Sequence, residues 1–299
     1  MELIHLKNTS LAYEVYGDRK LPPVVLIMGL GTSSYGWPRE FIRMLMEKGL
    51  QIILVDNRDC GRSGRIRAQG NYPSIGVAIG RALLRLPVMA PYTLEDMAMD
   101  YSELLDKLGI ESAHIVGASL GGMIAQILAT LRPSKVKSLV SMMSASGNPR
   151  TGFGKLKTIY TLFFPLEERK PDFSPEEYYK RVLDALKSPN YTYPKDTVQT
   201  MIRNIIQGGL DIKGTERQLL AILASGDRSE QIKRIIAPTL VIHGEDDPLL
   251  PLAAGKEVAD LIPGAQLKIL KQMGHDLPPI HLQEMADDIA SLAWEAETN

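Results

Sequence analysis

The stretch IVGASLGGM, Ile115–Met123, decides the fold class of this chain. An apolar run ends at Val116, and a helical pattern rich in small residues begins at Leu120. Between them the residues read Gly-x-Ser-x-Gly, a spacing that predicts a sharp turn from a buried strand into a helix. Glycines on both sides remove Cβ atoms that would clash there. The turn would hold Ser119 strained and exposed at a helix N-terminus, where backbone amides favour developing negative charge.

Buried-strand patterns recur on both sides of this turn. Two alternating runs, Glu2–Leu6 and Leu11–Tyr16, predict a β-hairpin at the start of the chain. Apolar strands then alternate with helical patterns, and the strands lie at Val24–Met28, Ile52–Val55, Ala113–Val116, Val136–Met142, Thr239–Ile242 and Gln266–Leu270. This alternation predicts an α/β fold, a parallel sheet covered by helices on both faces. A chain of 299 residues is long enough to bury a large core.

One segment interrupts the alternation of strands and helices. Residues 144–237 hold helical patterns punctuated by proline and glycine, without a buried-strand pattern. The segment leaves from the carboxyl end of a strand, the edge at which α/β sheets bind ligands. We therefore predict a core of residues 1–143 and 238–299, and a helical cap of residues 144–237 that serves as a lid.

Composition narrows the class of protein. The 34 basic and 35 acidic residues are spread along the chain, so nucleic acid is not an expected partner. Cys60 is the one cysteine, which excludes an internal disulfide, and no Cys/His spacing indicates a metal or another cofactor. The N-terminus lacks a secretory pattern, and no apolar run approaches the roughly 20 residues of a membrane span. We expect a cytoplasmic protein, and the sequence leaves its oligomeric state open.

A serine nucleophile needs a general base, and the chain has five histidines. His275 follows the last strand in the loop MGHD, at a strand end like that of Ser119. It is therefore the predicted base, and His281, at the start of the last helix, is the alternative.

The base in turn needs a carboxylate that holds its tautomer and stabilises the imidazolium. The loop HGEDDPLLP, His243–Pro251, offers three acids directly after a predicted strand. Asp247 is favoured because Pro248 fixes the turn behind it, and Asp246 is the alternative.

Backbone amides near the serine are the expected oxyanion donors. One is the N–H of Leu120, which follows the nucleophile, and the other is the N–H of Leu30 after the first buried strand. The apolar segments Ile75–Met89 and Tyr160–Phe164 either line an acyl or aromatic pocket or form ordinary core. The side chains expected at the pocket are Met28, Gly29, Trp37, Phe163 and Phe164.

With Ser119, Asp247 and His275 in this order, the chain resembles the α/β-hydrolase superfamily nearly end to end. GEDDPLLP (244–251) is similar to its G-x-x-D-x-x-x-P acid loop, and Met28 stands where a histidine is frequent. DNRDCGRS (56–63) is similar to its D-x-R-G-x-G-x-S turn, with Asp59 in place of the usual glycine. That variant resembles the branch of bacterial carboxylesterases that includes aclacinomycin methylesterase. The resemblance implies an eight-stranded, mostly parallel sheet with a helical cap after the sixth strand.

The predicted function is a serine hydrolase that cleaves small to medium carboxylic esters through an acyl-enzyme on Ser119, without a cofactor. Four alternatives share the triad: a proline-iminopeptidase-like peptidase, a C–C bond hydrolase, a lactonase and a perhydrolase. The peptidase would bind a free amine with acids in the cap, where Glu176, Glu177 and Asp184 are available, although an amphipathic helix explains them equally. A non-catalytic ligand binder on the same fold is the alternative of another class, and it needs no complete triad.

Overall fold

The computed structural model describes residues 1–67, 70–163, 174–209 and 211–298. Its centre is one eight-stranded sheet in the order β1-β2-β4-β3-β5-β6-β7-β8. The strands are β1 Glu2–His5, β2 Ser10–Tyr16, β3 Pro23–Ile27, β4 Gln51–Val55, β5 Ala113–Ala118, β6 Val136–Met142, β7 Thr239–Gly244 and β8 Gln266–Leu270. β2 runs antiparallel to β1 and β4, and every pair from β4 to β8 is parallel. The predicted α/β fold with a mostly parallel sheet is confirmed.

The central strands are continuous apolar runs because both of their faces are covered. In the middle of the sheet, Leu26 on β3 lies opposite Leu54 on β4 and Val116 on β5, and all three side chains are buried. This register brings the carboxyl ends of β3, β5 and β6 to one edge of the sheet. Loops that follow these strands can therefore form a common site.

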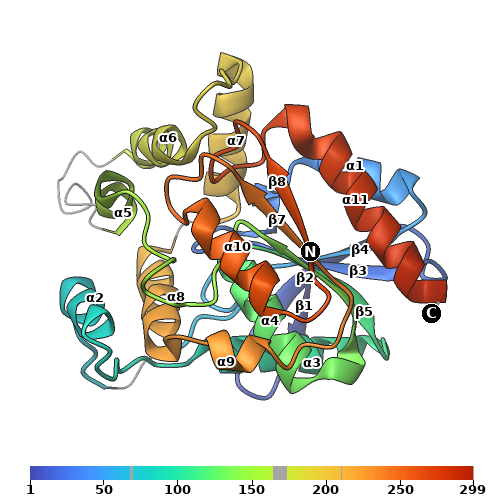
Figure 1. The fold of residues 1–299 in the computed structure, drawn as a ribbon, viewed down its shortest axis with the longest axis horizontal. Helices are drawn as coiled ribbons and strands as arrows, with labels where there is room; N and C mark the ends of the chain where they lie inside the picture. The colour runs from blue at the N-terminus through green and yellow to red at the C-terminus, as the bar shows by residue number, and fades with distance from the viewer. Residues whose placement is uncertain (68–69, 164–173, 210, 299) are drawn as a thin grey trace.

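Helices cover the two faces of the sheet (Figure 1). One face packs against α1 (Arg39–Glu47) and α11 (Pro279–Thr298), and the other against α3 (Leu94–Leu108), α4 (Leu120–Leu131) and α10 (Leu252–Leu261). α3 starts at a capping box in which Thr93 and Asp96 bond each other's backbone N–H, and it ends at Gly109 with φ 69°. Two short 3-10 helices, Ser34–Gly36 and Pro133–Lys135, complete these layers.

The chain between β6 and β7 is helical, at the place where the sequence predicts an insertion. Its helices are α5 Leu156–Phe163, α6 Pro175–Leu186, α7 Lys195–Gln207, α8 Ile212–Ser225 and α9 Ser229–Ile232. The end of this segment differs from the expected boundary at residue 237. α9 packs on α4 and α10, and Ile232, Ile235 and Ala237 join the buried cluster beneath α3 and α4. Their apolar side chains place them with the sheet layer.

A helix that the sequence reading did not identify, α2 (Ile75–Leu83), lies between β4 and α3 in the chain. It sits beside α8 at the outer edge of the molecule (Figure 1). α2 and α8 therefore flank the same region although about 130 residues separate them. None of the helices in the described ranges is both long and apolar enough for a bilayer crossing.

Candidate active site

Ser119 occupies the turn between β5 and α4 with φ 55° and ψ −117°, a conformation that non-glycine residues rarely adopt. Its backbone N–H donates to the Met142 carbonyl at 2.9 Å. The Ser144 hydroxyl donates to the Ser119 carbonyl at 2.8 Å. Two contacts with the end of β6 and its loop thus hold the strained residue in place.

The neighbouring glycines allow the backbone to pack closely around this turn. A Cβ on Gly121 would lie 2.0 Å from the Ile27 carbonyl oxygen, and one on Gly117 would lie 2.1 Å from the Gly121 carbonyl oxygen. Either contact would force the backbone apart. The two glycines of the Gly-x-Ser-x-Gly stretch are therefore required by packing as well as by turn geometry.

Ser119, His275 and Asp247 form a hydrogen-bonded chain. The Ser119 Oγ lies 3.0 Å from His275 Nε2, and His275 Nδ1 lies 2.7 Å from Asp247 Oδ2. The Asp247 Oδ1 accepts the backbone N–H groups of Leu249 and Leu250, each at 2.8 Å. Because a carboxylate only accepts, Nδ1 carries the proton and the Nε2 lone pair faces the serine hydroxyl. This arrangement can take a proton from Ser119.

The two alternatives from the sequence lie outside this chain of hydrogen bonds. Asp246 has an exposed side chain. His281 donates from Nε2 to the Lys271 carbonyl at 3.0 Å, at the start of α11.

A second histidine, His243, is fully buried beside the acid loop. Its Nε2 donates to the Leu250 carbonyl at 2.8 Å and lies 3.6 Å from Asp247 Oδ2. Burial lowers the pKa of His243, so the ring stays neutral. Asp247 Oδ2 lies closer to the other histidine, at 2.7 Å from His275 Nδ1.

The loop that carries His275 is bound to the segment between α6 and α7. The His275 N–H donates to the Leu186 carbonyl at 2.8 Å. The Asp276 carboxylate accepts the Ser188 N–H at 2.9 Å, the Ser188 hydroxyl at 2.7 Å and the Tyr193 hydroxyl at 2.7 Å. Burial raises the pKa of Tyr193, so its phenol remains a donor. Segments nearly 90 residues apart thus share the positioning of the histidine.

The predicted oxyanion donors flank the serine. Leu120 is the first residue of α4, so its N–H has no acceptor within the helix. Leu30 follows β3, the strand beside β5. Within the described residues, neither N–H donates a hydrogen bond, which leaves both available to a ligand.

Two buried amide side chains fix the loop that contains Leu30. Asn57 Nδ2 donates to the Met28 carbonyl at 2.9 Å. Gln218 on α8 accepts the Gly31 N–H at 2.8 Å and donates to the Arg58 carbonyl at 2.7 Å. Sequence reasoning missed both residues. Gln218 had no local signal, whereas Asn57 lies in the quoted DNRDCGRS turn.

Asp59, the unusual residue of that turn, has φ 64°. Its side chain is fully buried and accepts Arg217 Nε at 2.8 Å and a second Arg217 nitrogen at 2.7 Å. It also accepts the Ile66 N–H at 2.7 Å. The bidentate pair fixes α8 to the turn after β4, and so holds Gln218 near the oxyanion loop.

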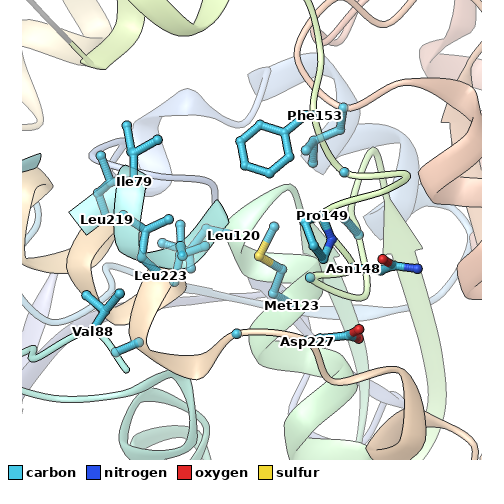
Figure 2. Close-up of a pocket in the computed structure, with 18 of the residues that line it drawn as sticks. Ile79, Val88, Leu120, Met123, Asn148, Pro149, Phe153, Leu219, Leu223 and Asp227 are labelled. Carbon is cyan, nitrogen blue, oxygen red and sulfur yellow. The ribbon is translucent and has the colours of Figure 1, made fainter. Parts of the chain in front are cut away.

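Two cavities meet at Ser119. The larger, of about 470 Å³, lies against α2, α4 and α8, and the smaller, of about 240 Å³, lies against α6, α7 and His275. Leu30, Leu219 and Leu249 line both. Figure 2 shows the larger cavity, with Ile79, Leu219 and Leu223 facing Met123 and Phe153 across it. Apolar side chains dominate both linings.

The residues predicted for the pocket divide into three groups. Met28 and Gly29 line the smaller cavity. The prediction for Trp37 is wrong, because its ring is buried against Phe41 at 5.7 Å, on the face covered by α1. The side chain of Phe163 and all of Phe164 lie outside the described residues. Residues between 79 and 88 line the larger cavity. Of the two alternatives for Ile75–Met89, pocket lining is therefore favoured over ordinary core.

Across the described ranges, no cluster of three or more His, Cys, Asp or Glu side chains forms a metal site.

Comparisons with known proteins agree with this fold. The alpha/beta hydrolase fold family model matches residues 22–281. Rhodomycin D methylesterase DauP of a Streptomyces species is 26% identical over 293 residues, which is 92% of each chain. A 2-hydroxy-6-oxononadienedioate/2-hydroxy-6-oxononatrienedioate hydrolase of Cupriavidus pinatubonensis is 27% identical over 282 residues, 91% of this chain and 84% of that protein.

Solved structures give the same architecture. An enol-lactonase from Burkholderia xenovorans superimposes with a TM-score of 0.72 and 23% identity over the full length of both chains. A meta-cleavage product hydrolase from Pseudomonas fluorescens has a TM-score of 0.75 and 23% identity over 99% of this chain and 98% of that one. At this level of identity, the structural matches bear on the fold alone.

Proposed function

The chain belongs to the alpha/beta hydrolase fold family, and from that premise we propose a serine hydrolase that cleaves carboxylic esters through an acyl-enzyme on Ser119. Ester hydrolysis is the activity named for its methylesterase relatives, and the chain is an ester-hydrolysing enzyme of this kind. The observation that carries the finer proposal is the hydrogen-bonded chain from Ser119 through His275 to Asp247, where the two cavities meet.

The mechanism follows from the placement of the protons. His275 Nε2 removes the Ser119 proton as the serine oxygen attacks the ester carbonyl. The carbonyl oxygen becomes an oxyanion, which the N–H groups of Leu30 and Leu120 stabilise. When the intermediate collapses, His275 gives its proton to the leaving alcohol and the acyl group stays on Ser119. Water, activated by His275 in the same way, then releases the acid and restores the serine.

The two cavities would hold the two halves of the ester. The leaving oxygen must lie near His275, because the imidazole protonates it. His275 lines the smaller cavity, so the alcohol half belongs there. The acyl half then takes the remaining, larger cavity, which Leu120 lines. This arrangement predicts a substrate with a bulky apolar acyl group and a more compact alcohol.

Charges near Ser119 disfavour an anionic ester. Among the described residues that line the two cavities, Arg85 is the only arginine or lysine, whereas Asp227 lines the larger cavity and Glu216 and Asp276 line the smaller one. The acids expected to serve a peptidase, Glu176, Glu177 and Asp184, line an outer groove beside α7 that shares Leu183, Met201 and Asp276 with the smaller cavity. None of these three acids lines either cavity at Ser119, so a peptidase would have to bind the amine with Glu216 or Asp276, which line the smaller cavity.

C–C bond hydrolysis is the second candidate, because the Cupriavidus relative is named for a dienedioate substrate. Such a substrate carries carboxylates, and a site that binds it needs cationic partners. The linings supply Arg85 alone among the described residues, at the rim of the larger cavity. We therefore rank ester cleavage first, and a higher kcat/KM on a dienedioate than on any ester of a graded series would reverse the order.

The direct test uses Ser119→Ala on p-nitrophenyl esters. Removing the nucleophile should lower kcat by about 10⁶-fold while the far-UV circular dichroism spectrum stays unchanged. A variant that keeps wild-type turnover would refute the serine mechanism. A folded wild-type protein that binds esters without turning them over would support the binder alternative.

The cavity assignment has its own matched pair of variants. Leu223→Trp narrows the larger cavity and Val182→Trp narrows the smaller one. The first should reduce turnover of long-acyl esters and spare acetates of bulky alcohols, and the second should do the reverse. The opposite pattern would exchange the two assignments.

A further inference from the structure

The stretch from α2 to Met89 exposes an unusual amount of apolar surface. Of twelve large hydrophobic side chains exposed in the described residues, five belong to these fifteen positions, 75–89. They are Val77 (55% exposed), Leu83 (52%), Leu84 (72%), Leu86 (47%) and Met89 (64%). Isolated exposed leucines are ordinary on a protein surface, but a group of this density marks an interaction site.

The exposed residues follow the geometry of the helix. Val77, Arg81 and Leu84 are spaced i, i+4 and i+7, so they lie on one side of α2. Ala78 is buried, and Ile79 and Ala82 line the larger cavity. One face of α2 therefore serves the cavity beside Ser119 while another presents leucine and valine to solvent.

The patch is also positively charged. Residues 75–90 contain Arg81 and Arg85 and no acidic residue. Both arginines are exposed, and no carboxylate of the described residues pairs with either. Arg81 donates to the Pro87 carbonyl at 2.7 Å, which holds the residues after α2 against the helix. The nearby cavity acid, Asp227, is engaged by the N–H and hydroxyl of Ser229.

From these observations we propose that α2 and the residues to Met89 dock on an anionic lipid surface. Apolar side chains would enter the interface while Arg81 and Arg85 meet lipid phosphates. The surface continues into the larger cavity, whose rim includes Arg85, Leu86 and the part-exposed Phe153. Docking would bring an apolar ligand from the lipid directly to the cavity mouth.

A second copy of this chain fits the patch less well. In a twofold dimer the same patch meets itself, so Arg81 and Arg85 would face the arginines of the other copy without acids to compensate them. An anionic lipid headgroup supplies the complementary charge. The proposal extends beyond ester hydrolysis, and lipid binding is measurable without turnover.

The test is co-sedimentation with large unilamellar vesicles. The wild-type protein should bind phosphatidylglycerol vesicles at low ionic strength, bind phosphatidylcholine vesicles far less, and detach as salt is raised. Leu83→Gln combined with Leu84→Gln should weaken binding by about tenfold or more. Neither residue lines a cavity, and both are more than half exposed, so the thermal unfolding midpoint should stay near the wild-type value.

The matched control replaces two exposed isoleucines elsewhere, Ile236→Gln with Ile280→Gln, which are 79% and 56% exposed. It should bind vesicles as the wild type does. Absence of phosphatidylglycerol binding, equal binding to the two lipids, or equal loss in the control would overturn the proposal. If the wild-type protein forms a dimer and the Leu83→Gln, Leu84→Gln protein does not, the patch binds a second copy of the chain. That result would also overturn the proposal.

Discussion

Replacing Asp247 by asparagine should disable the base without disturbing the loop around it. The Asp247 Oδ1 accepts two backbone N–H groups, and only an oxygen can replace it there. The amide oxygen of asparagine therefore takes that side and turns its NH2 toward His275 Nδ1. Because NH2 only donates, Nδ1 must give up its proton and Nε2 must carry it. The Nε2–H would then face Ser119 Oγ across 3.0 Å and could not accept the serine proton.

The expected loss follows from the wrong tautomer. Such a change costs about 10⁴-fold in kcat, or about 5.4 kcal/mol of transition-state stabilisation at 1.36 kcal/mol per tenfold. The free energy of unfolding should change little, because the three hydrogen bonds keep their partners. The assay is steady-state hydrolysis of a short-chain p-nitrophenyl ester by Asp247→Asn, with urea denaturation of the same sample.

The matched control is the neighbouring exposed acid, Asp246→Asn, which should retain kcat within about twofold. An Asp247→Asn enzyme within tenfold of the wild type would refute the reasoning. An equal loss of kcat in Asp246→Asn would also refute it, because the loss would then not depend on the hydrogen bond between Asp247 and His275.

Three further outcomes are expected. Gln218→Leu should lower kcat about tenfold or more with little change in KM, because the Gly31 N–H loses its acceptor and the oxyanion loop shifts. An unchanged kcat would contradict this expectation. Arg217→Met should lower the free energy of unfolding in urea by about 2–4 kcal/mol, since it leaves buried Asp59 without its cation, and wild-type stability would argue against that role. Burial lowers the folded-state pKa of His243, so the unfolded chain binds the proton more readily and stability should fall below about pH 6.5. In His243→Asn that fall should be shallower, and parallel curves would count against it.

Strand-end positions were predictable from sequence because parallel strands end at one edge of the sheet. Ser119, Asp247 and His275 each follow a strand, and the structure brings their side chains within hydrogen-bond distance. Glycine spacing and the Asp-x-x-x-Pro loop gave further local signals.

Contacts that depend on tertiary docking were not predictable. Gln218 lies in a segment whose helical pattern was predicted. Its hydrogen bond to the Gly31 N–H spans 187 positions, and a helical pattern does not indicate such a distant partner. Trp37 follows the glycine-rich loop closely in sequence, yet packing against Phe41 on α1 turns its ring away from the site. α2 was missed because Gly76 and Gly80 weaken its helical pattern.

The central claim is that Ser119 carries the acyl group. The most direct measurement is mass spectrometry of the protein after reaction with a fluorophosphonate, followed by peptide mapping. The account predicts one adduct, on the peptide that contains Ser119, and none in Ser119→Ala. An adduct on another residue, or a wild-type protein that hydrolyses esters yet stays unlabelled, would contradict it.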